Sequence, residues 1–451
     1  MDNFVVENLG PIAKVDVTFG DLTILTGPQA SGKTLFLETF KLMKDFVGVI
    51  TDYREQNPDV KLEDLLNYFY GDGMNKIISQ QTEIIYNNKQ IDIKSITNNS
   101  LSSKLQDTPT VDSAPVPLKE KTSGLGGALG FGALGFGLFG PIGFGLGLTT
   151  ALLLLSLKGD DSSDSYKRLI NLIKKIQETG DTNLSESDKE SIKKLVDAVR
   201  EKIFFVPAQR SSAISEGRIL LSRDFINSPY VLVKFSGYLQ QFVKTQQYGI
   251  IRESIKDYNF LKNAEINMRR TAGSPRLEMT VDNQTVPYMA WSTGQREFTP
   301  LLMALDYFES IDNKEYIVIE EPELGLHPRA IIEFMFTVLK LMKKGVKVII
   351  STHSSTPLDF VWTMNRLKHK GVKSFAALAE MFDFKIKDKD FFDGLFEKEI
   401  KVYYFAPDKK TRKVHSKDIS SLDVESEDED ISNWGGMSLS ADRAGSIVSK
   451  F

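Results

Sequence analysis

The sequence has no cysteine among its 451 residues. Disulfides, thiolate nucleophiles and zinc–sulfur sites are therefore excluded, and we expect the protein to work in a reducing cytoplasm. Histidine is scarce as well: the four histidines, at positions 327, 353, 369 and 415, are too dispersed in the sequence to suggest a metal cluster. The formal net charge is −4, so the chain as a whole has no positive field that would attract nucleic acid. The first residues lack the basic and apolar segments of a secretory signal, and we expect none.

Charge is absent from one long stretch, residues 123–157, which consists mostly of glycine, leucine, phenylalanine and alanine. Its length and apolarity meet the usual criterion for a transmembrane helix, but each glycine costs a helix roughly 1 kcal/mol relative to alanine. We consider three interpretations. The favoured one is a buried or oligomer-interface insertion in which glycine allows close packing; the others are a poorly ordered, partner-sensing segment and membrane contact through small residues.

Residues 27–34 read Gly-Pro-Gln-Ala-Ser-Gly-Lys-Thr, a complete G-x-x-x-x-G-K-[ST] phosphate-binding loop, or Walker A motif. Residues 22–26 before it are apolar and rich in β-formers, and residues 35–40 after it begin a helical pattern. A strand, a glycine loop and a helix in this order point bare backbone N–H groups at a phosphate. The sequence therefore predicts a binding site for a nucleoside triphosphate.

Two later apolar runs end in residues that suit phosphate chemistry. Residues 316–319 are apolar and lead directly into Glu320 and Glu321. A buried strand that delivers acids at its carboxyl end provides what Mg²⁺ and an attacking water need. We therefore expect Glu320 to hold the metal, through water, and Glu321 to polarise the nucleophilic water. A second apolar run, residues 348–350, leads into His353, whose imidazole would reach the γ-phosphate.

A serine- and glycine-containing turn, residues 291–296, lies upstream of the acidic strand. Ser292 and Gly294 at a helix start would form a second anion-binding end from a hydroxyl, backbone N–H groups and the helix dipole, with Gln295 beside them. On the motif alone, an ordinary helix N-cap explains these residues as well. Their place just before the acidic strand favours the anion site.

The order of these four motifs resembles the ABC-type ATPases of the SMC and DNA-repair kind. Residues 320–328, Glu-Glu-Pro-Glu-Leu-Gly-Leu-His-Pro, look like the E-E-P-E-x-x-L-H-P box of stand-alone prokaryotic ATPases related to the OLD family. Residues 204–210, Phe-Phe-Val-Pro-Ala-Gln-Arg, are similar to the strand-Pro-Ala-x-Arg element of those proteins. One position departs from the ABC pattern, which usually has aspartate where this chain has Glu320. The resemblance covers about residues 1–45, 203–212 and 264–360.

The resemblance implies a role for each matching residue. Lys33 would neutralise the β- and γ-phosphates, and Thr34 would ligate Mg²⁺. His353 would act as the switch histidine. In that family two ATP molecules lie between two heads, so Ser292 and Gly294 would contact the γ-phosphate held by the opposing subunit.

Two further roles follow from the strand-Pro-Ala-x-Arg element: Gln209 would sense the metal or the water, and Arg210 would contact a phosphate or the opposing subunit. The implied catalytic residues are Glu321, His353 and Lys33, and the implied metal ligands are Thr34, Glu320 and Gln209. The implied ATP-binding residues are Gly27, Pro28, Gln29, Ala30, Ser31, Gly32, Lys33, Thr34, Gln209, Arg210, Ser292, Gly294 and Gln295.

The implied fold is an α/β ABC-type P-loop head, a mixed sheet flanked by helices, with an inserted helical and glycine-rich region. The strand–helix alternation of the second half of the chain also indicates an α/β sheet. In the C-terminal region we expect a strand pair near 401–405 and 413–415 and a mobile acidic stretch at 423–430. The expected division is 1–50 as the first part of the core, 51–202 as the insertion with a polar linker at 95–122, 203–360 as the rest of the core with a helical subdomain at 215–262, and 361–451 as the C-terminal region.

The biological role depends on what accompanies the ATPase. OLD-type proteins join it to a C-terminal Toprim nuclease, but no strand-borne Asp-x-Asp follows residue 357, so we predict no intrinsic nuclease. A stand-alone head resembles the ATPase subunits of phage-defence operons, among them the Septu-type ATPase and, nearer in size, the ATPase subunit of the PARIS system. That resemblance implies an ATP-bound homo-oligomer, a dimer of heads or larger. It would hold a separate Toprim-type nuclease until a phage trigger protein is sensed.

The alternative is a repair-type ATPase that binds DNA ends or gaps. It needs a basic face, and the one obvious candidate is residues 409–413, Lys-Lys-Thr-Arg-Lys, which a solvated hairpin turn explains as well. An ABC transporter subunit is disfavoured, because the Walker A motif and the serine–glycine turn lie too far apart in the sequence.

Overall fold

The computed structural model describes most of the chain outside the central insertion. The described residues are 1–56, 62–91, 200–225, 227–245, 261, 264–270, 275–311, 314–368, 376–378, 380, 394–438 and the isolated positions 185, 187 and 448. The expected polar linker, the glycine-rich segment and His369 lie outside them. Within these residues no helix is both long and apolar enough to cross a membrane. The chain divides into two units, one of Met1–Phe40, Tyr70–Ile91 and Ile203–Phe451 and the other of Lys41–Phe69 and Asp92–Lys202.

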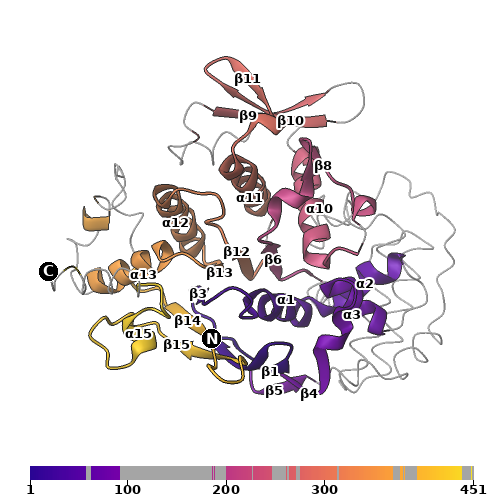
Figure 1. Cartoon of the computed structure of the whole chain (residues 1–451). Coiled ribbons are helices and arrows are strands. Elements are labelled where there is room, and N and C mark those ends of the chain that lie inside the picture. The colour runs from indigo at the N-terminus through magenta and orange to yellow at the C-terminus, as the bar shows by residue number, and fades with distance from the viewer. Residues whose placement is uncertain are drawn as a thin grey trace. The chain divides into compact units, whose positions relative to one another are not determined.

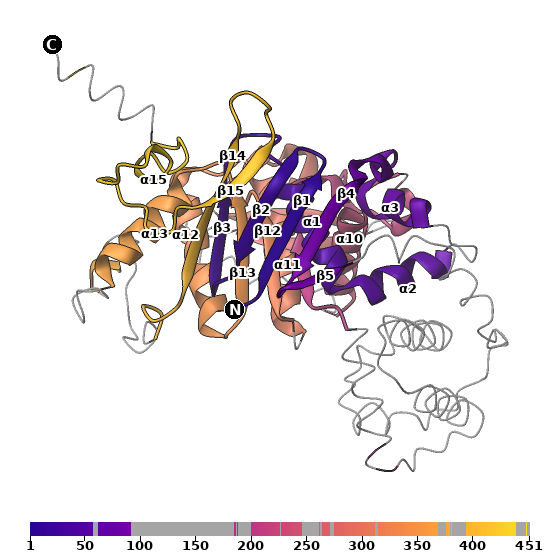
Figure 2. The same cartoon turned by 90° about the horizontal axis from the view of Figure 1, so that it is seen from below.

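A ten-stranded mixed sheet forms the centre of the first unit (Figures 1 and 2). Its strand order is β5-β4-β1-β2-β15-β14-β3-β13-β12-β6. The strands are β1 (Asn3–Leu9), β2 (Ile12–Thr18), β3 (Leu22–Thr26), β4 (Ile78–Tyr86), β5 (Lys89–Ile91), β6 (Ile203–Val206), β12 (Tyr316–Glu320), β13 (Lys347–Thr352), β14 (Ile400–Pro407) and β15 (Val414–Asp418).

The strands that end at the predicted motifs are parallel neighbours. β6, β12, β13, β3 and β14 pair in parallel, whereas β1, β2 and β4 pair antiparallel. Parallel strands are covered on both faces and therefore read as continuous apolar runs. Every residue of β3 and β12 is buried, in agreement with this rule. The predicted α/β class with a mixed sheet is confirmed.

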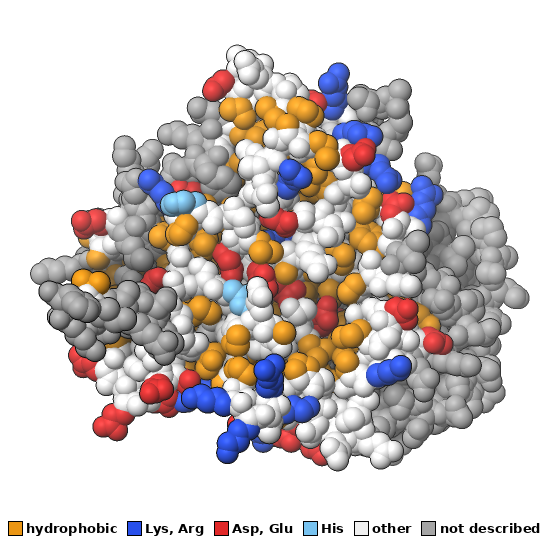
Figure 3. Space-filling view, viewed as in Figure 1, with side chains coloured by type: hydrophobic (Ala, Val, Ile, Leu, Met, Phe, Trp, Pro, Cys, Tyr) orange, Lys and Arg blue, Asp and Glu red, His pale blue; other side chains and the backbone are white. Residues whose placement is uncertain are grey.

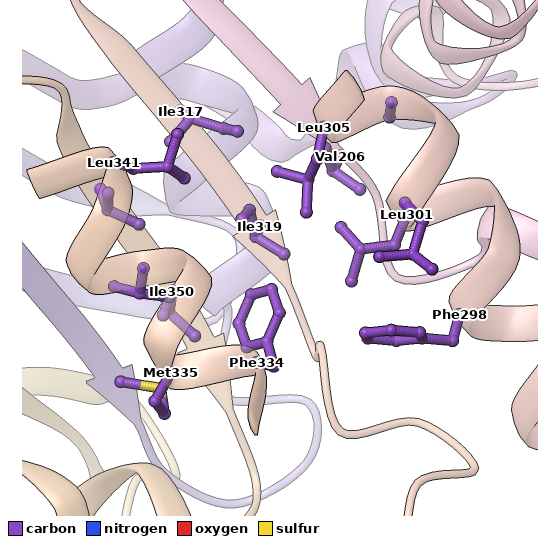
Figure 4. Close-up of a cluster of buried hydrophobic side chains, with 14 of the residues drawn as sticks. Val206, Phe298, Leu301, Leu305, Ile317, Ile319, Phe334, Met335, Leu341 and Ile350 are labelled. Atoms are coloured by element: carbon purple, nitrogen blue, oxygen red, sulfur yellow. The ribbon is translucent and has the colours of Figure 1, made fainter. Parts of the chain in front are cut away.

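Helices cover the two faces of this sheet. The helix after the predicted phosphate loop, α1 (Lys33–Lys44), lies on one face, and α11 (Thr293–Ser310) and α12 (Pro328–Lys343) lie on the other (Figure 1). On the α11 and α12 side, fully buried apolar side chains from these helices and the strands point toward one another (Figure 4). Each such side chain contributes about 1.5–3 kcal/mol through burial. On the other side, the rings of Phe36 and Phe40 contact Phe4, Phe19 and Phe405.

The C-terminal strand pair is confirmed, and it lies inside the sheet. β14 pairs with β3 and β15 pairs with β2, so the two strands connect the N-terminal strands to the parallel part (Figure 2). Our expected division left residues 361–451 outside the core. The structure differs from this division because tertiary packing determines which strands are neighbours in a sheet. These two strands pair with β3 and β2, which come from the other end of the chain.

The acidic stretch at 423–430 makes specific contacts in the structure, and its expected mobility stays a prediction. Lys417 Nζ pairs with Asp428 Oδ1 at 2.6 Å and with Asp430 Oδ2 at 2.7 Å, and Asp428 also caps the short helix α15 (Glu429–Ser432). The buried Trp434 donates from Nε1 to the carbonyl of Leu422. These contacts fold the stretch back onto the end of the sheet.

Smaller elements complete the first unit. A separate three-stranded sheet consists of β9 (Ala264–Arg270), β10 (Pro275–Val281) and β11 (Gln284–Pro287). The helical subdomain expected at 215–262 contains α10 (Tyr230–Thr245), and its residues 246–260 lie outside the described part. The remaining elements are β7 (Ile214–Ser215), β8 (Arg218–Ile219) and α13 (Thr356–Leu367).

The described part of the second unit contains a buried ion pair. The described part of this unit comprises the end of α1, α2 (Phe46–Gln56) and most of α3 (Leu62–Tyr70). Lys41 is fully buried, and its Nζ donates to Asp45 at 2.8 Å and to Glu201 at 2.7 Å. Removal of one partner from such a pair leaves a buried charge uncompensated and costs about 3–5 kcal/mol.

Candidate functional site

The predicted phosphate loop connects β3 to α1. The chain takes positive φ angles at Gly27 (147°), Ala30 (59°) and Gly32 (80°), which bend it into a tight turn at the helix start. At Gly27 a side chain is excluded as well, because a Cβ atom there would lie 2.8 Å from the carbonyl oxygen of Phe405 in β14. The strand–loop–helix arrangement is the one in which main-chain N–H groups and the helix N-terminus bind phosphate.

Lys33 is held inside this loop. Its side chain is only 5% exposed, and Nζ donates to the carbonyls of Gly27 and Pro28, both at 3.0 Å, and to Ser31 Oγ at 3.1 Å. Burial lowers the pKa of Lys33 to about 8, against the opposing effect of three nearby glutamates. The ammonium thus donates to the loop's own neutral oxygens. Phosphate oxygens are stronger acceptors for a charged donor, so the loop fits a nucleoside triphosphate.

Glu320 lies opposite the end of the loop. It is 2% exposed, accepts a hydrogen bond from the N–H of Ala208 at 3.3 Å, and lies beside the Thr34 side chain. Its Oε1 is buried and has no hydrogen-bond partner among the described residues. Burial raises the pKa of Glu320 to about 7. Hydroxyl and carboxylate oxygens are ligands that Mg²⁺ prefers, and a cation would satisfy the orphaned oxygen, so the pair fits a magnesium ion.

Glu321 and His353 come together at the ends of neighbouring strands. β12 and β13 are parallel, and the N–H of Glu321 donates to the carbonyl of Ser351 at 2.8 Å. Glu321 has a φ angle of 42°, which is unusual for a residue with a side chain. Its Oε1 lies 3.5 Å from His353 Nε2. The two side chains are 27% and 25% exposed, so a water or a phosphate can reach both.

The same edge of the sheet carries further acidic groups. Acidic side chains and a histidine gather near the centre of the face shown in Figure 3. Sequence reasoning assigned no role to Glu323, yet its Oε1 accepts from the N–H of His353 at 2.6 Å and from Thr352 Oγ1 at 2.8 Å. The signal available in the sequence was the third glutamate of the E-E-P-E box. Glu323 thus holds the backbone at His353.

The signature turn, Ser292–Gln295, is a capped helix start. Ser292 Oγ accepts from the N–H of Gln295 at 3.3 Å, and Gln295 Oε1 accepts from the N–H of Ser292 at 2.9 Å. Gly294 packs against the main chain of Gly325, so a side chain there is excluded. In the described part of the chain no hydrogen bond joins Ser292 to the loop at 27–34. The turn therefore lies beside the loop that follows β12 and presents an exposed serine.

The structure places the two residues of the Pro-Ala-x-Arg element differently. Gln209 is exposed and adjoins Ala208, whose N–H binds Glu320. Arg210 is fully buried, and its guanidinium donates only to main-chain carbonyls. Among the described residues the guanidinium is thus bound to the main chain of its own subunit, and the phosphate or trans contact expected for Arg210 stays a prediction.

Residues 59–356 of the chain match the AAA ATPase domain family; the match begins after the loop at 27–34. No curated protein matches the sequence.

Similar solved structures include two SMC heads. The SMC head domain from Thermotoga maritima is 9% identical, with 79% of this chain and 90% of that chain covered and a TM-score of 0.31. The Smc head domain with an extended coiled coil bound to the C-terminal domain of ScpA, from Pyrococcus furiosus, is 10% identical, with 94% and 98% covered and a TM-score of 0.30. Because the family match spans more than half of the chain, the protein belongs to the AAA ATPase domain family and is a P-loop enzyme that hydrolyses ATP.

Proposed function

We propose that this enzyme hydrolyses ATP between two copies of itself, and that the ATP-bound assembly restrains a separate nuclease in anti-phage defence. The observation that carries the first part is the signature turn. Ser292 is exposed, and the turn packs against the loop after β12, yet in the described residues no hydrogen bond reaches the chain's own P-loop. Because the hydroxyl and N–H groups of this turn do not bind the phosphate loop of their own chain in the described residues, they are available to a phosphate bound by a second copy.

The chain's own residues would hold the substrate as follows. Lys33 and the amides of the loop bind the β- and γ-phosphates, and Thr34 and Glu320 hold Mg²⁺, with Gln209 as a further candidate. Bound Mg²⁺ supplies charge neutralisation on the phosphates. Glu321 orients and polarises the attacking water, and its contact with His353 keeps both groups at the γ-phosphate position.

The defence role is supported by the E-E-P-E-x-x-L-H-P resemblance and by the C-terminal strands. β14 and β15 are strands of the ATPase sheet, so in the described C-terminal residues they serve the ATPase. In this proposal the nuclease is a separate chain of the Toprim type, and it is released when a phage trigger protein is sensed. This part is tested by purification of the tagged chain from its natural host with and without ATP: ATP-dependent co-elution of a Toprim-type nuclease supports it, and elution with ATP but without a nuclease contradicts it.

Mixing two inactive variants tests whether the site is shared. Lys33→Ala removes the phosphate loop's cation, and Ser292→Arg blocks the signature turn. If each site combines the loop of one copy with the turn of the other, a mixed dimer contains one intact site, and ATPase activity appears when the two variants are mixed.

The matched control pairs Lys33→Ala with Glu321→Gln. Both changes lie on the same side of a site, so no mixed dimer contains an intact one and no activity returns. If subunit exchange is verified and ATPase activity returns in neither mixture, the site is not shared between two copies.

The second candidate function is DNA binding through the turn between β14 and β15. Asp408 Oδ1 accepts from the N–H groups of Lys410 and Thr411, at 2.9 and 2.7 Å, which fixes the turn. Lys409, Lys410 and Arg412 are exposed and have no acidic partner among the described residues. If they contact DNA phosphates, replacing all three with glutamine lowers affinity and flattens its salt dependence.

A further inference from the structure

Arg210 has an unusual environment for a charged residue. Its side chain is fully buried, and its hydrogen bonds go to four main-chain carbonyls. Nη1 donates to Glu320 at 2.6 Å and to Pro207 at 3.4 Å. Nη2 donates to Glu321 at 3.0 Å, and Nε donates to Glu297 at 3.2 Å. Among the described residues no carboxylate lies within ion-pair distance of the guanidinium.

Burial of a cation without an ion-pair partner is energetically unfavourable, so a functional reason for its position is expected. Removal of a charge from water is unfavourable unless the protein replaces the lost hydration with hydrogen bonds or an opposite charge. Burial lowers the pKa of Arg210, and the charges of nearby glutamates, chiefly Glu297, oppose that effect. An apolar side chain of similar length would fill the same volume without this cost. The position of the donors, rather than packing, therefore distinguishes arginine here.

The four carbonyls belong to three segments, and each segment carries a part of the candidate site. Glu320 and Glu321 are the predicted metal ligand and base. Glu297 lies in the second turn of α11, directly after the signature turn. Pro207 precedes Ala208, whose N–H binds the carboxylate of Glu320. One guanidinium thus fixes the relative positions of three strand and helix ends that are far apart in the sequence.

We propose that Arg210 is a positioning residue that ties the signature helix α11 to the catalytic end of β12 and holds Glu321 in its left-handed backbone conformation. A residue with φ near 42° persists only where its surroundings constrain it, since such a conformation is strained for a residue with a side chain. The carbonyl of Glu321 is fixed by Arg210 and its N–H by Ser351. Without the guanidinium, Glu321 loses one of the two bonds that aim its carboxylate at His353. This inference rests on the proposed role of Glu321 as the base.

The first experiment separates turnover from binding. Arg210→Met keeps the length of the side chain without donors, and Arg210→Lys keeps the charge with a single donor group. We expect kcat to fall roughly 100-fold in Arg210→Met, as for a catalytic group displaced by about 1 Å, and less in Arg210→Lys, with the dissociation constant for ATP within threefold of the parent. Ser211→Ala is the matched control: it removes the Ser211 Oγ bond to the side chain of Glu297, at 2.5 Å, and leaves the main-chain contacts intact.

The second experiment asks whether Arg210 acts through Glu321. In a Glu321→Gln background the base is already lost, so Arg210→Lys should lower the single-turnover rate by less than threefold. A merely structural residue would lower both rates by the same factor, because independent effects add.

The outcomes separate the two proposals. Normal turnover in Glu321→Gln alone means that the base is misassigned, whatever Arg210 does. Equal losses in both backgrounds, or a normal kcat in Arg210→Met, overturn the positioning role. If Arg210→Met does not fold, Arg210→Lys decides by the same cycle, and an unchanged kcat in that variant overturns the proposal.

Discussion

The two sides of the nucleotide site are built in different ways. The phosphate side is residues 27–34, a single segment in which glycines, lysine and threonine follow one another. The carboxylate side combines the ends of β12 and β13, the start of α11 and the loop after β6, and Arg210 binds the main chain of three of these segments. A continuous segment keeps its geometry when distant parts shift, whereas an assembled one depends on every contact. We therefore expect changes on the phosphate side to affect ATP binding and changes on the carboxylate side to affect turnover.

The largest effect should come from Lys33→Ala on the phosphate side. The variant loses the one ammonium held within the loop, and hydrogen bonds to charged groups contribute about 1.5–3 kcal/mol each. We expect ATP affinity to fall roughly 100-fold or more, measured by titration calorimetry. Lys14→Ala, a change of a half-exposed lysine on β2 that pairs with Glu7, should leave affinity unchanged. If Lys33→Ala binds ATP normally but does not hydrolyse it, the phosphate side affects turnover rather than binding, and the expected difference between the two sides is wrong.

Gly27→Ala tests how independent the phosphate side is. The carbonyl of Phe405 lies against this glycine, so the loop also depends on β14, from the far end of the chain. A Cβ atom would approach that backbone oxygen to 2.8 Å, and a side chain in such a backbone conformation costs about 1–3 kcal/mol. We expect roughly a tenfold loss of ATP affinity from a distortion of that size, measured by titration with a fluorescent ATP analogue.

Gly345→Ala is the matched control for Gly27→Ala. Gly345 also has a positive φ angle, of 81°, but no atom lies within 4 Å of the position that a Cβ would take. It should lower the melting temperature and leave ATP affinity unchanged. If both variants bind ATP like the parent, contact with β14 is not part of the phosphate side.

The same contrast explains how much of the site could be predicted from the sequence. The loop at 27–34 is recognisable because its function depends on residues that are adjacent in the chain. Glu320, Glu321 and His353 were also accessible, because each ends an apolar run, and the carboxyl ends of parallel strands meet at one edge of a sheet. The structure brings these three to one edge, next to Lys33 and Thr34.

What could not be predicted depends on tertiary contacts. Arginine can donate to a phosphate or to a set of carbonyls, and the contacts that Arg210 makes with main-chain carbonyls exist only in the fold. β14 and β15 pair with β3 and β2 from the opposite end of the chain, so no local pattern places them inside the sheet. The acidic run stays partly exposed, but the side chain of Lys417 bridges Asp428 and Asp430, a contact that depends on where β15 lies in the fold.

Glu323→Gln should give the smallest effect and sharpens the comparison on the carboxylate side. The amide oxygen can still accept from Thr352 Oγ1 and from the N–H of His353, but the negative charge is lost. The buried Oε2 atom has no hydrogen-bond partner in the described chain. An NH₂ group in its place would have no acceptor. Charge-assisted hydrogen bonds are roughly twice as strong as neutral ones, so the backbone at His353 is held less firmly. We expect kcat to fall about fivefold, as for a loss near 1 kcal/mol, while ATP affinity stays the same. Glu309→Gln, which removes an exposed ion pair with Lys344, should change neither quantity. A weaker ATP affinity in Glu323→Gln would mean that the carboxylate side also contributes to binding, and that the separation between the two sides is incomplete.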